Sequence, residues 1–148
     1  MLKKQAFIQL YLRIAMGVTF LVPGLDRLGV WGPHGKPNVS WGDWAHFSAY
    51  AKQLMGFLPG SVAGVLAVLA TVGEIGFGAL LILGLFTRMA AVGAGLLLLC
   101  FALSMWITYG IVAPLSYSVF VDSAACLLLS TISAYKWSLD AVLFTREK

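Results

Sequence analysis

The sequence predicts an all-α integral membrane protein, an antiparallel four-helix bundle built as a single domain over residues 1–148. The first observation is composition, because 60% of the residues are hydrophobic, 11% are charged and the mean hydropathy is +0.90. A soluble domain carries about a quarter charged residues, so this chain has too few to cover a water-facing surface. The second observation is a set of four long apolar runs with mostly short connections.

Charge is modest and scattered along the chain. The formal net charge is +4, but the ten lysines and arginines form no basic block. A nucleic-acid-binding role is therefore excluded, since that function needs a basic patch. In membrane proteins a small basic excess marks the loops that face an anionic leaflet, so we expect the lipid bilayer as the main partner.

Each apolar run is long enough to cross about 30 Å of hydrocarbon at about 1.5 Å per residue. Little more than Phe86-Thr87-Arg88 joins the second and third runs, and a turn around Gly110 and Pro114 joins the third and fourth. Short links make sequential helices antiparallel neighbours. We expect spans at about residues 5–24, 60–85, 89–109 and 115–135, with an outer segment at residues 25–59.

The first span is interpreted as a retained helix. Lys3 and Lys4 precede it, as in a signal peptide, but Arg13 interrupts the apolar run and no A-x-A cleavage site follows. With the N-terminus inside, more basic residues lie inside than outside, which predicts a multi-pass inner-membrane protein with both termini cytoplasmic. The inner basic residues are Lys3, Lys4, Arg88, Lys136, Arg146 and Lys148, and the outer ones are Arg27, Lys36 and Lys52.

The outer segment is predicted to hold one further helix. A Gly/Pro-rich loop is followed by Ser40-Trp41-Gly42-Asp43, which has the spacing of a capping box. A helix from this point is amphipathic and lies along the outer surface, with Trp41 and Trp44 as interface anchors. Its apolar side would carry Trp44, Phe47, Ala51, Leu54, Met55 and Leu58, and its polar side Asp43, His46, Tyr50 and Gln53.

Three ionisable residues, Arg13, Glu74 and Asp122, lie well inside the spans. Each costs about 2.5–3.5 kcal/mol at a helix centre, so each needs a partner or water. The helical rise places Glu74 and Asp122 about 21 Å from the inner edge, and Arg13 about 14 Å from it with a side chain that reaches further outward. We therefore expect one polar layer. It is either a buried Arg13–Glu74 ion pair that fixes helix register or a functional pocket in which Asp122 carries protons.

Each span carries small or polar residues along one face, and we predict that these faces point toward the interior of the bundle. The stripes are Gln9, Arg13, Gly17, Phe20 and Gly24; Ala70, Glu74 and Gly78; Gly93, Cys100, Ser104 and Thr108; and Ser118, Asp122, Cys126 and Ser130. Cys100 and Cys126 lack a C-x-x-C context and are interpreted as small buried apolar residues rather than a redox pair. Neither His34 nor His46 has a second ligand at helical spacing, so no metal or haem site is expected, and no glycine-rich nucleotide motif is present.

Two blocks of the chain resemble the DoxX family of small bacterial membrane proteins. They are Leu12-Arg13-x3-Gly17-x2-Phe20-x3-Gly24-x2-Arg27-Leu28, and Gly73-Glu74-x3-Gly78 through Gly84-Leu85-Phe86-Thr87-Arg88-x-Ala90-Ala91. The resemblance implies a four-helix transmembrane bundle linked to redox chemistry, since one relative is the membrane subunit of a thiosulfate:quinone oxidoreductase. It also places Arg13, Arg27, Glu74 and Arg88 on the family's recurrent polar positions, although Arg27 stands where lysine is more usual.

The leading hypothesis is a quinone-interacting subunit that supports membrane electron transfer or oxidative-stress defence, with quinone as the cofactor. Arg13 would bind a quinone carbonyl, Glu74 would position Arg13 or accept protons, and Asp122 would relay protons. The cofactor-binding set comprises Arg13, Glu74, Arg27, Trp41, Trp44 and His46, with Phe47 beside the tryptophans at the outer mouth.

Two other functions stay open. One is a non-enzymatic scaffold that recruits a partner oxidoreductase to the membrane, and the other is a small lipid-binding or transport protein. A homo-oligomer formed through the small-residue face at Gly60-x3-Gly64 is also compatible with the sequence.

Overall fold

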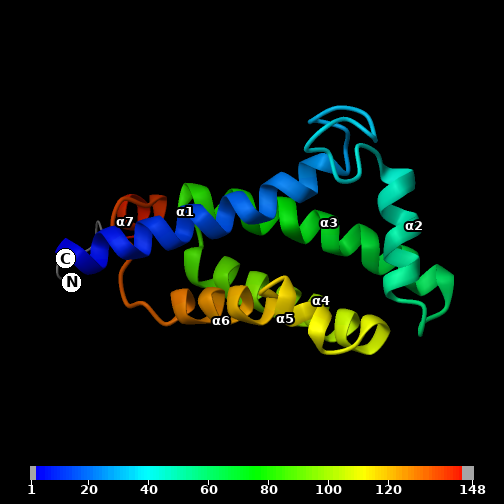
Figure 1. Cartoon of the computed structure of the whole chain (residues 1–148). Coiled ribbons are helices and arrows are strands. Elements are labelled where there is room, and N and C mark those ends of the chain that lie inside the picture. Colours follow the sequence, from blue (N-terminus) through cyan, green and yellow to red (C-terminus); the bar gives the residue numbers. More distant parts are fainter. Residues whose placement is uncertain (1–2, 145–148) are drawn as a thin grey trace.

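A computed structural model of the chain describes residues 3–144, and these residues are folded into helices and connecting loops without a β-strand (Figure 1). The helices are α1 (Lys3–Asp26), α2 (Trp44–Leu54), α3 (Gly60–Leu83), α4 (Thr87–Tyr109), α5 (Val112–Ser116), α6 (Val119–Ser130) and α7 (Leu139–Leu143). The all-α prediction is confirmed for this part of the chain.

Three helices are long and apolar enough to cross a membrane, which supports the prediction of a membrane protein. The candidate spans are Lys4–Asp26, Gly60–Leu83 and Thr87–Tyr109, with mean hydropathies of 1.5, 2.2 and 2.2. At about 1.5 Å per residue each exceeds the roughly 30 Å of a bilayer core. They correspond to the first three spans expected from the sequence.

The fourth expected span, residues 115–135, is not one continuous helix, so the predicted bundle of four spanning helices is not confirmed. Ser118 has a φ of 55°, a left-handed conformation that separates α5 from α6. Helix α6 has 12 residues, or about 18 Å, which is too short to cross a bilayer. At its end the hydroxyls of Ser130 and Thr131 donate to backbone carbonyls three residues earlier, which competes with helix continuation.

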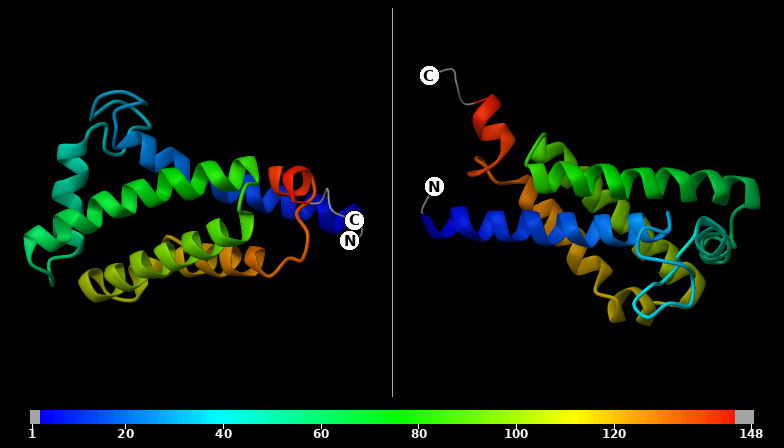
Figure 2. Two further views of the ribbon diagram at one scale, coloured as in Figure 1. Left: turned by 180° about the vertical axis from the view of Figure 1, so that it is seen from behind. Right: turned by 90° about the horizontal axis from the view of Figure 1, so that it is seen from above.

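The helices form two layers, with α1 beside α3 and α4 beside α6 (Figures 1 and 2). The layers meet at the turn between α3 and α4, and α7 lies at this same end. We call it the turn end. From there α3 and α4 diverge, and α2 lies across the opposite end, the α2 end. The hydroxyl of Thr108 donates to the carbonyl of Leu54 at 2.6 Å and fastens α2 to α4.

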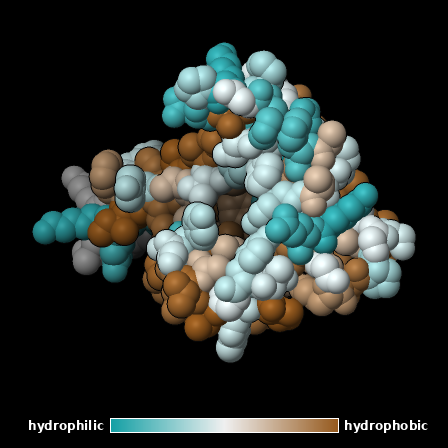
Figure 3. Space-filling view, turned by 45° about the vertical axis from the view of Figure 1, so that its right-hand side comes forward, coloured by the Kyte–Doolittle hydropathy of each residue, from teal (hydrophilic) through white to brown (hydrophobic). Residues whose placement is uncertain are grey.

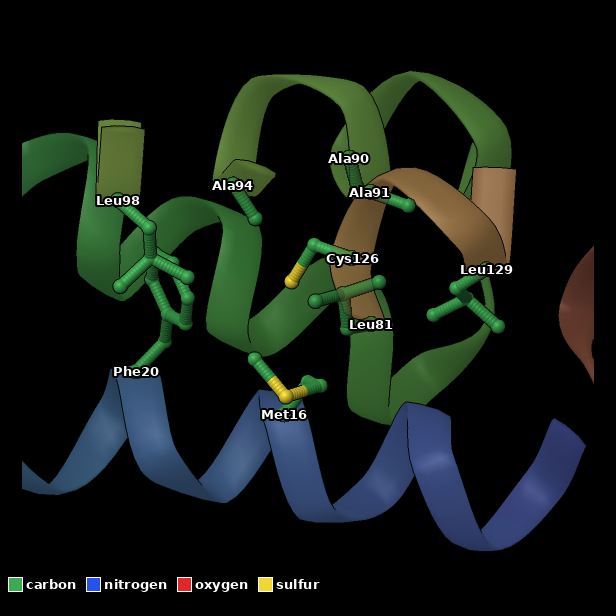
Figure 4. Close-up of a cluster of buried hydrophobic side chains, with 9 residues drawn as sticks. All are labelled: Met16, Phe20, Leu81, Ala90, Ala91, Ala94, Leu98, Cys126 and Leu129. Atoms are coloured by element: carbon green, nitrogen blue, oxygen red, sulfur yellow. The ribbon is translucent and has the colours of Figure 1, made fainter. Parts of the chain in front are cut away.

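Nine buried side chains fill the space between the layers near the turn end (Figure 4). Helix α4 contributes three alanines, whose small size lets it approach its neighbours closely. Cys126 is fully buried and serves as a small apolar side chain, as expected. The cluster consists of Met16, Phe20, Leu81, Ala90, Ala91, Ala94, Leu98, Cys126 and Leu129.

The segment after α6 is held by side chains from α1. Gln9 Nε2 donates to the carbonyl of Lys136 at 2.9 Å, and Arg13 Nη2 donates to the carbonyl of Trp137 at 2.6 Å. Non-helical backbone inside a membrane is tolerated where protein groups satisfy it. These bonds bring both ends of the described chain to the turn end; Arg146 and Lys148, used in the charge count, lie outside the described residues.

The turn between α3 and α4 is closed by α7. Gly84 ends α3 with a φ of 68°, a left-handed conformation that glycine adopts without strain. The carboxylate of Asp140 then accepts hydrogen bonds from the backbone N–H groups of Phe86 and Thr87 at 2.7 and 2.8 Å. A negative charge at a helix N-terminus is favourable, so Asp140 caps α4 across 53 residues of sequence.

Helix α2 begins later and ends earlier than the sequence indicated. The capping box at Ser40 is wrong, because Asp43 is the N-cap and accepts from the backbone N–H of His46 at 2.9 Å. The N–H groups of Ser40 and Trp41 instead donate to the Asp26 carboxylate at 3.0 and 2.7 Å. The buried residues of α2 are Phe47, Ala51 and Leu54, whereas Trp44 is exposed and Leu58 lies beyond the helix.

Helices α1 and α3 touch through glycines. A Cβ placed at Gly78 would lie 2.9 Å from the carbonyl oxygen of Gly17, and one at Gly17 would lie 3.0 Å from that of Gly78. The two backbones are therefore in direct contact, which is the close approach that small residues permit in membranes.

We predict that Gly78→Ala destabilises the protein by about 1–3 kcal/mol, because the new methyl group forces the two backbones apart. The measurement is the free energy of unfolding in mixed micelles, followed by circular dichroism. Gly76→Ala is the matched control on the same helix, since a Cβ there meets nothing within 4 Å. It should be neutral or stabilising by about 0.5–1 kcal/mol. Equal effects of the two changes would contradict the glycine contact.

Candidate ligand-binding site

A cavity of about 710 Å³ lies between α2, α3 and α4, where the two layers diverge. Its walls are largely apolar, with leucine, phenylalanine and alanine side chains from all three helices. Arg27 and Glu74 are the charged residues among those that line it. Figure 3, which brings the α2 end forward, shows this face hollowed, with hydrophobic atoms inside the hollow.

Arg27 and Glu74 form a buried ion pair on the cavity wall. Nη2 of Arg27 lies 2.9 Å from Oε1 and 2.8 Å from Oε2 of Glu74, and 6% of each side chain is exposed. Nη1 of Arg27 donates to the hydroxyl of Thr71 at 2.9 Å, and this hydroxyl donates to the carbonyl of Ala67. The pair therefore joins the end of α1 to the middle of α3.

Phe47 of α2 covers the pair. The guanidinium carbon of Arg27 lies 3.7 Å from the centre of the Phe47 ring, which is a close cation–π contact. Phe47 is itself buried and packs with Ala51 and Ala67. One arginine thus connects α1, α3 and α2 around the cavity.

The direction of the helices explains why these two residues meet. Side chains of an α-helix lean toward the helix N-terminus. Arg27 continues the last turn of α1, since its N–H donates to the carbonyl of Pro23. Its side chain therefore leans back into the bundle. Glu74 belongs to α3, which starts at the α2 end, so its side chain leans toward Arg27.

The same preference for the N-terminal direction explains why the predicted Arg13–Glu74 ion pair is wrong. Arg13 leans toward the turn end, where a Cβ placed at Gly84 would lie 2.7 Å from Nη1 of Arg13. Gly84 is ten residues from Glu74, or about 15 Å along the helix direction. Arg13 is 1% exposed and holds the Trp137 carbonyl instead of Glu74. The single polar layer is therefore not formed, and neither Arg13 nor Asp122 is among the residues that line the cavity.

The remaining residues of the predicted cofactor-binding set lie partly at the cavity and partly away from it. Trp41 lines the cavity, but Trp44 and His46 are not among its lining residues. The exposed ring of His46 stacks on His34 with 3.7 Å between centroids, and its Nδ1 lies 2.8 Å from Oδ2 of Asp43. Hydrogen bonds from the backbone and the ring of His46 lower the pKa of the Asp43 carboxyl. These residues organise the start of α2.

Sequence reasoning missed several residues of the site. Thr71 lies three residues before Glu74 on the same face of α3, a spacing that marked it as a neighbour. Cys100 and Ser104 line the cavity from α4, and the sequence had placed both on an inward stripe.

Among the described residues, no group of three His, Cys, Asp or Glu side chains is arranged to hold a metal ion.

Two residues that line the cavity are also highly exposed. Leu69 on α3 is 60% exposed and Ile107 on α4 is 63% exposed, which indicates a lateral mouth between these helices. These apolar surfaces face lipid in a membrane protein, so the mouth opens to the bilayer. Cys100 also lines the cavity, and the expectation that it is buried is wrong, because its position on α4 leaves it exposed.

A second cavity, of about 680 Å³, adjoins the first at the α2 end. Both are lined by Trp41, Tyr50 and Met105, and the second is completed by Ser40, Tyr109, Ala113 and Tyr117. Burial, together with the neighbouring Tyr109 and Tyr117, raises the pKa of Tyr50. The aromatic rings of Trp41 and Tyr50 thus contribute to the walls of both cavities.

Comparison with known proteins gives one family. The DoxX family model matches residues 8–109, which include α2, α3, α4 and most of α1 as well as both members of the ion pair. No curated protein and no solved structure matches the chain.

We predict that either Arg27→Met or Glu74→Leu alone lowers the free energy of unfolding by about 3–5 kcal/mol, because each leaves an unpaired buried charge. The double variant Arg27→Met/Glu74→Leu should regain most of this loss, since two apolar side chains need no partner. Equilibrium unfolding in mixed micelles measures all three. Additive losses in the double variant would show that the two charges do not stabilise each other.

Proposed function

Because the chain belongs to the DoxX family of membrane proteins, we propose that its cavity binds a quinone from the bilayer. On this proposal the protein is a quinone-interacting subunit that supports membrane electron transfer or oxidative-stress defence. The observation that carries the proposal is the buried Arg27–Glu74 pair, which stands on the wall of an otherwise largely apolar cavity.

The chemistry of a quinone fits this wall. Its ring and isoprenoid tail are apolar, while its two carbonyl oxygens accept hydrogen bonds. A guanidinium supplies five N–H donors, and bonds from a charged donor are roughly twice as strong as neutral ones. A volume of about 710 Å³ also falls in the range of small-molecule sites.

The mouth between α3 and α4 gives such a ligand a route from the membrane. A lipid-soluble molecule passes Leu69 and Ile107 without leaving the hydrocarbon, and its ring then reaches the pair beneath α2. The basic residues of the sequence favour the turn end in the cytoplasm and the α2 end on the outer side of the inner membrane. The cavity is then in the outer half of the bilayer, beside a redox partner protein that supplies the electrons.

A lipid-binding function is the second candidate, and the lateral mouth favours it. An acyl chain fits the apolar walls as well as an isoprenoid tail does. The two candidates differ at the ion pair, because a quinone head needs the hydrogen-bonding groups of Arg27 and an acyl chain does not.

Alkylation of Cys100 measures occupancy of the cavity directly. The protein is placed in nanodiscs and treated with N-ethylmaleimide over a series of decylubiquinone concentrations, and the modified fraction is read by mass spectrometry. Cys126 is fully buried and reports unfolding. We expect saturable protection of Cys100 in the wild type and loss of at least about tenfold in affinity in Arg27→Met/Glu74→Leu, which removes the charged hydrogen bonds.

Asp122→Asn is the matched control, since it removes a charge in α6 that does not line the cavity. It should keep the protection of the wild type. If the double variant folds and is protected as well as the wild type, the pair does not bind the quinone. If oleic acid protects as well as decylubiquinone, lipid binding replaces quinone binding.

A further inference from the structure

The redox form of the bound ligand, a property that rests on the proposed function, depends on the Arg27–Glu74 pair. The hydrogen bonding of this pair is incomplete. Nε of Arg27 and Oε2 of Glu74 are both buried and have no hydrogen-bond partner. A buried polar group without a partner is energetically unfavourable, so the pair favours a ligand that satisfies it.

The neighbouring groups cannot fill this gap. Nη1 of Arg27 is bonded to the Thr71 hydroxyl and Nη2 to Oε1 of Glu74. Thr71 uses its own proton on the carbonyl of Ala67. Oε2 of Glu74 lies 2.8 Å from Nη2 but receives no hydrogen bond. Nε of Arg27 is thus a donor atom, and Oε2 of Glu74 an acceptor atom, that has no hydrogen-bond partner in the described protein.

We infer that the site binds the hydroquinone, the two-electron-reduced form of its ligand, more tightly than the quinone. Each hydroxyl group of a hydroquinone can both donate and accept a hydrogen bond. One hydroxyl can therefore accept a hydrogen bond from Arg27 Nε and donate one to Glu74 Oε2. A quinone carbonyl only accepts, and it leaves the carboxylate oxygen without a partner. The preference comes from Glu74, whereas Arg27 serves both forms.

Arg27 and Glu74 both line the cavity, and their two unpaired atoms are buried in its wall. The last torsion of a glutamate is broad and roughly two-fold, so its carboxyl group rotates at small cost. A rotation of this kind exchanges the two oxygens between Arg27 and the cavity.

Selective binding has a redox consequence. Reduction of the quinone consumes two electrons and two protons, and tighter binding of the product favours reduction at the site. A tenfold difference in affinity raises the potential of this two-electron couple by about 30 mV. The bound quinone is then a better electron acceptor for the partner protein than the quinone pool is.

The test compares three ligands of nearly the same shape under anaerobic conditions. They are decylubiquinone, decylubiquinol, and the dimethyl ether of decylubiquinol, which has the same ring oxygens but no O–H. Protection of Cys100 from N-ethylmaleimide is the readout for all three, and the fully substituted rings offer no position for thiol addition. We expect decylubiquinol to bind about tenfold more tightly than the other two.

Glu74→Gln should reduce this preference to less than about threefold, because the amide donates to a carbonyl as readily as it accepts from a hydroxyl. Asp122→Asn, which changes a carboxylate that does not line the cavity, should keep it. Equal binding of quinone and hydroquinone, or a preference that persists in folded Glu74→Gln, overturns the inference and leaves the proposed function standing. If none of the ligands protects Cys100, the proposed function itself fails. Should Glu74→Gln not fold, the comparison of hydroquinone with its ether in the wild type decides alone.

Discussion

The α2 end of the molecule depends on one interaction, the buried ion pair between Arg27 and Glu74. Removing two charges from water is expensive, and the cost is recovered only when geometry and further hydrogen bonds are good. Here Thr71 supplies a hydrogen bond and Phe47 supplies a ring face, so three helices contribute to one guanidinium. Without this contact, α2 is held by the small apolar cluster of Phe47, Ala51 and Ala67 and by the bond from Thr108.

The two buried arginines of the N-terminal part of the chain have separate tasks. Arg13 satisfies a backbone carbonyl of the non-helical segment at the turn end, and Arg27 stands on the cavity wall. Their separation follows from the bilayer, in which each polar group must find a partner within the protein. Polar residues in the spans of such a protein therefore do not imply one shared site. Each of them pairs with the nearest polar group that lacks a hydrogen-bond partner.

Much of the fold follows from the sequence by simple physics, and the failures are informative. Long apolar runs gave α1, α3 and α4 nearly residue by residue, since helix length must match the bilayer. The prediction of a spanning helix over the fourth run was wrong. Hydropathy does not reveal that Ser118 adopts a left-handed conformation, or that the Ser130 hydroxyl bonds to the backbone and ends the helix early. Glu74 was nominated as a candidate site residue because it is an ionisable residue well inside a predicted span. Its partner was predicted wrongly because the Arg13 side chain was expected to extend toward the outer side. Side chains of a helix lean toward its N-terminus, which for α1 is the turn end. The cavity depends on how far two helices diverge, and no local pattern encodes that.

Side-chain size explains the divergence and bears on what fills the space. Near the turn end α4 presents Ala90, Ala91 and Ala94, and the layers close on them. Toward the α2 end α4 presents Leu97, Phe101 and Met105 opposite α3, and the layers stand apart. An empty apolar cavity costs stability in proportion to its volume, so one that opens to the bilayer is filled by whatever the membrane offers. An acyl chain meets this apolar requirement but leaves Arg27 Nε and Glu74 Oε2 unsatisfied. A membrane-soluble molecule with a hydroxyl-bearing head satisfies the walls and the ion pair together, and that is the physical reason to regard the cavity as a binding site.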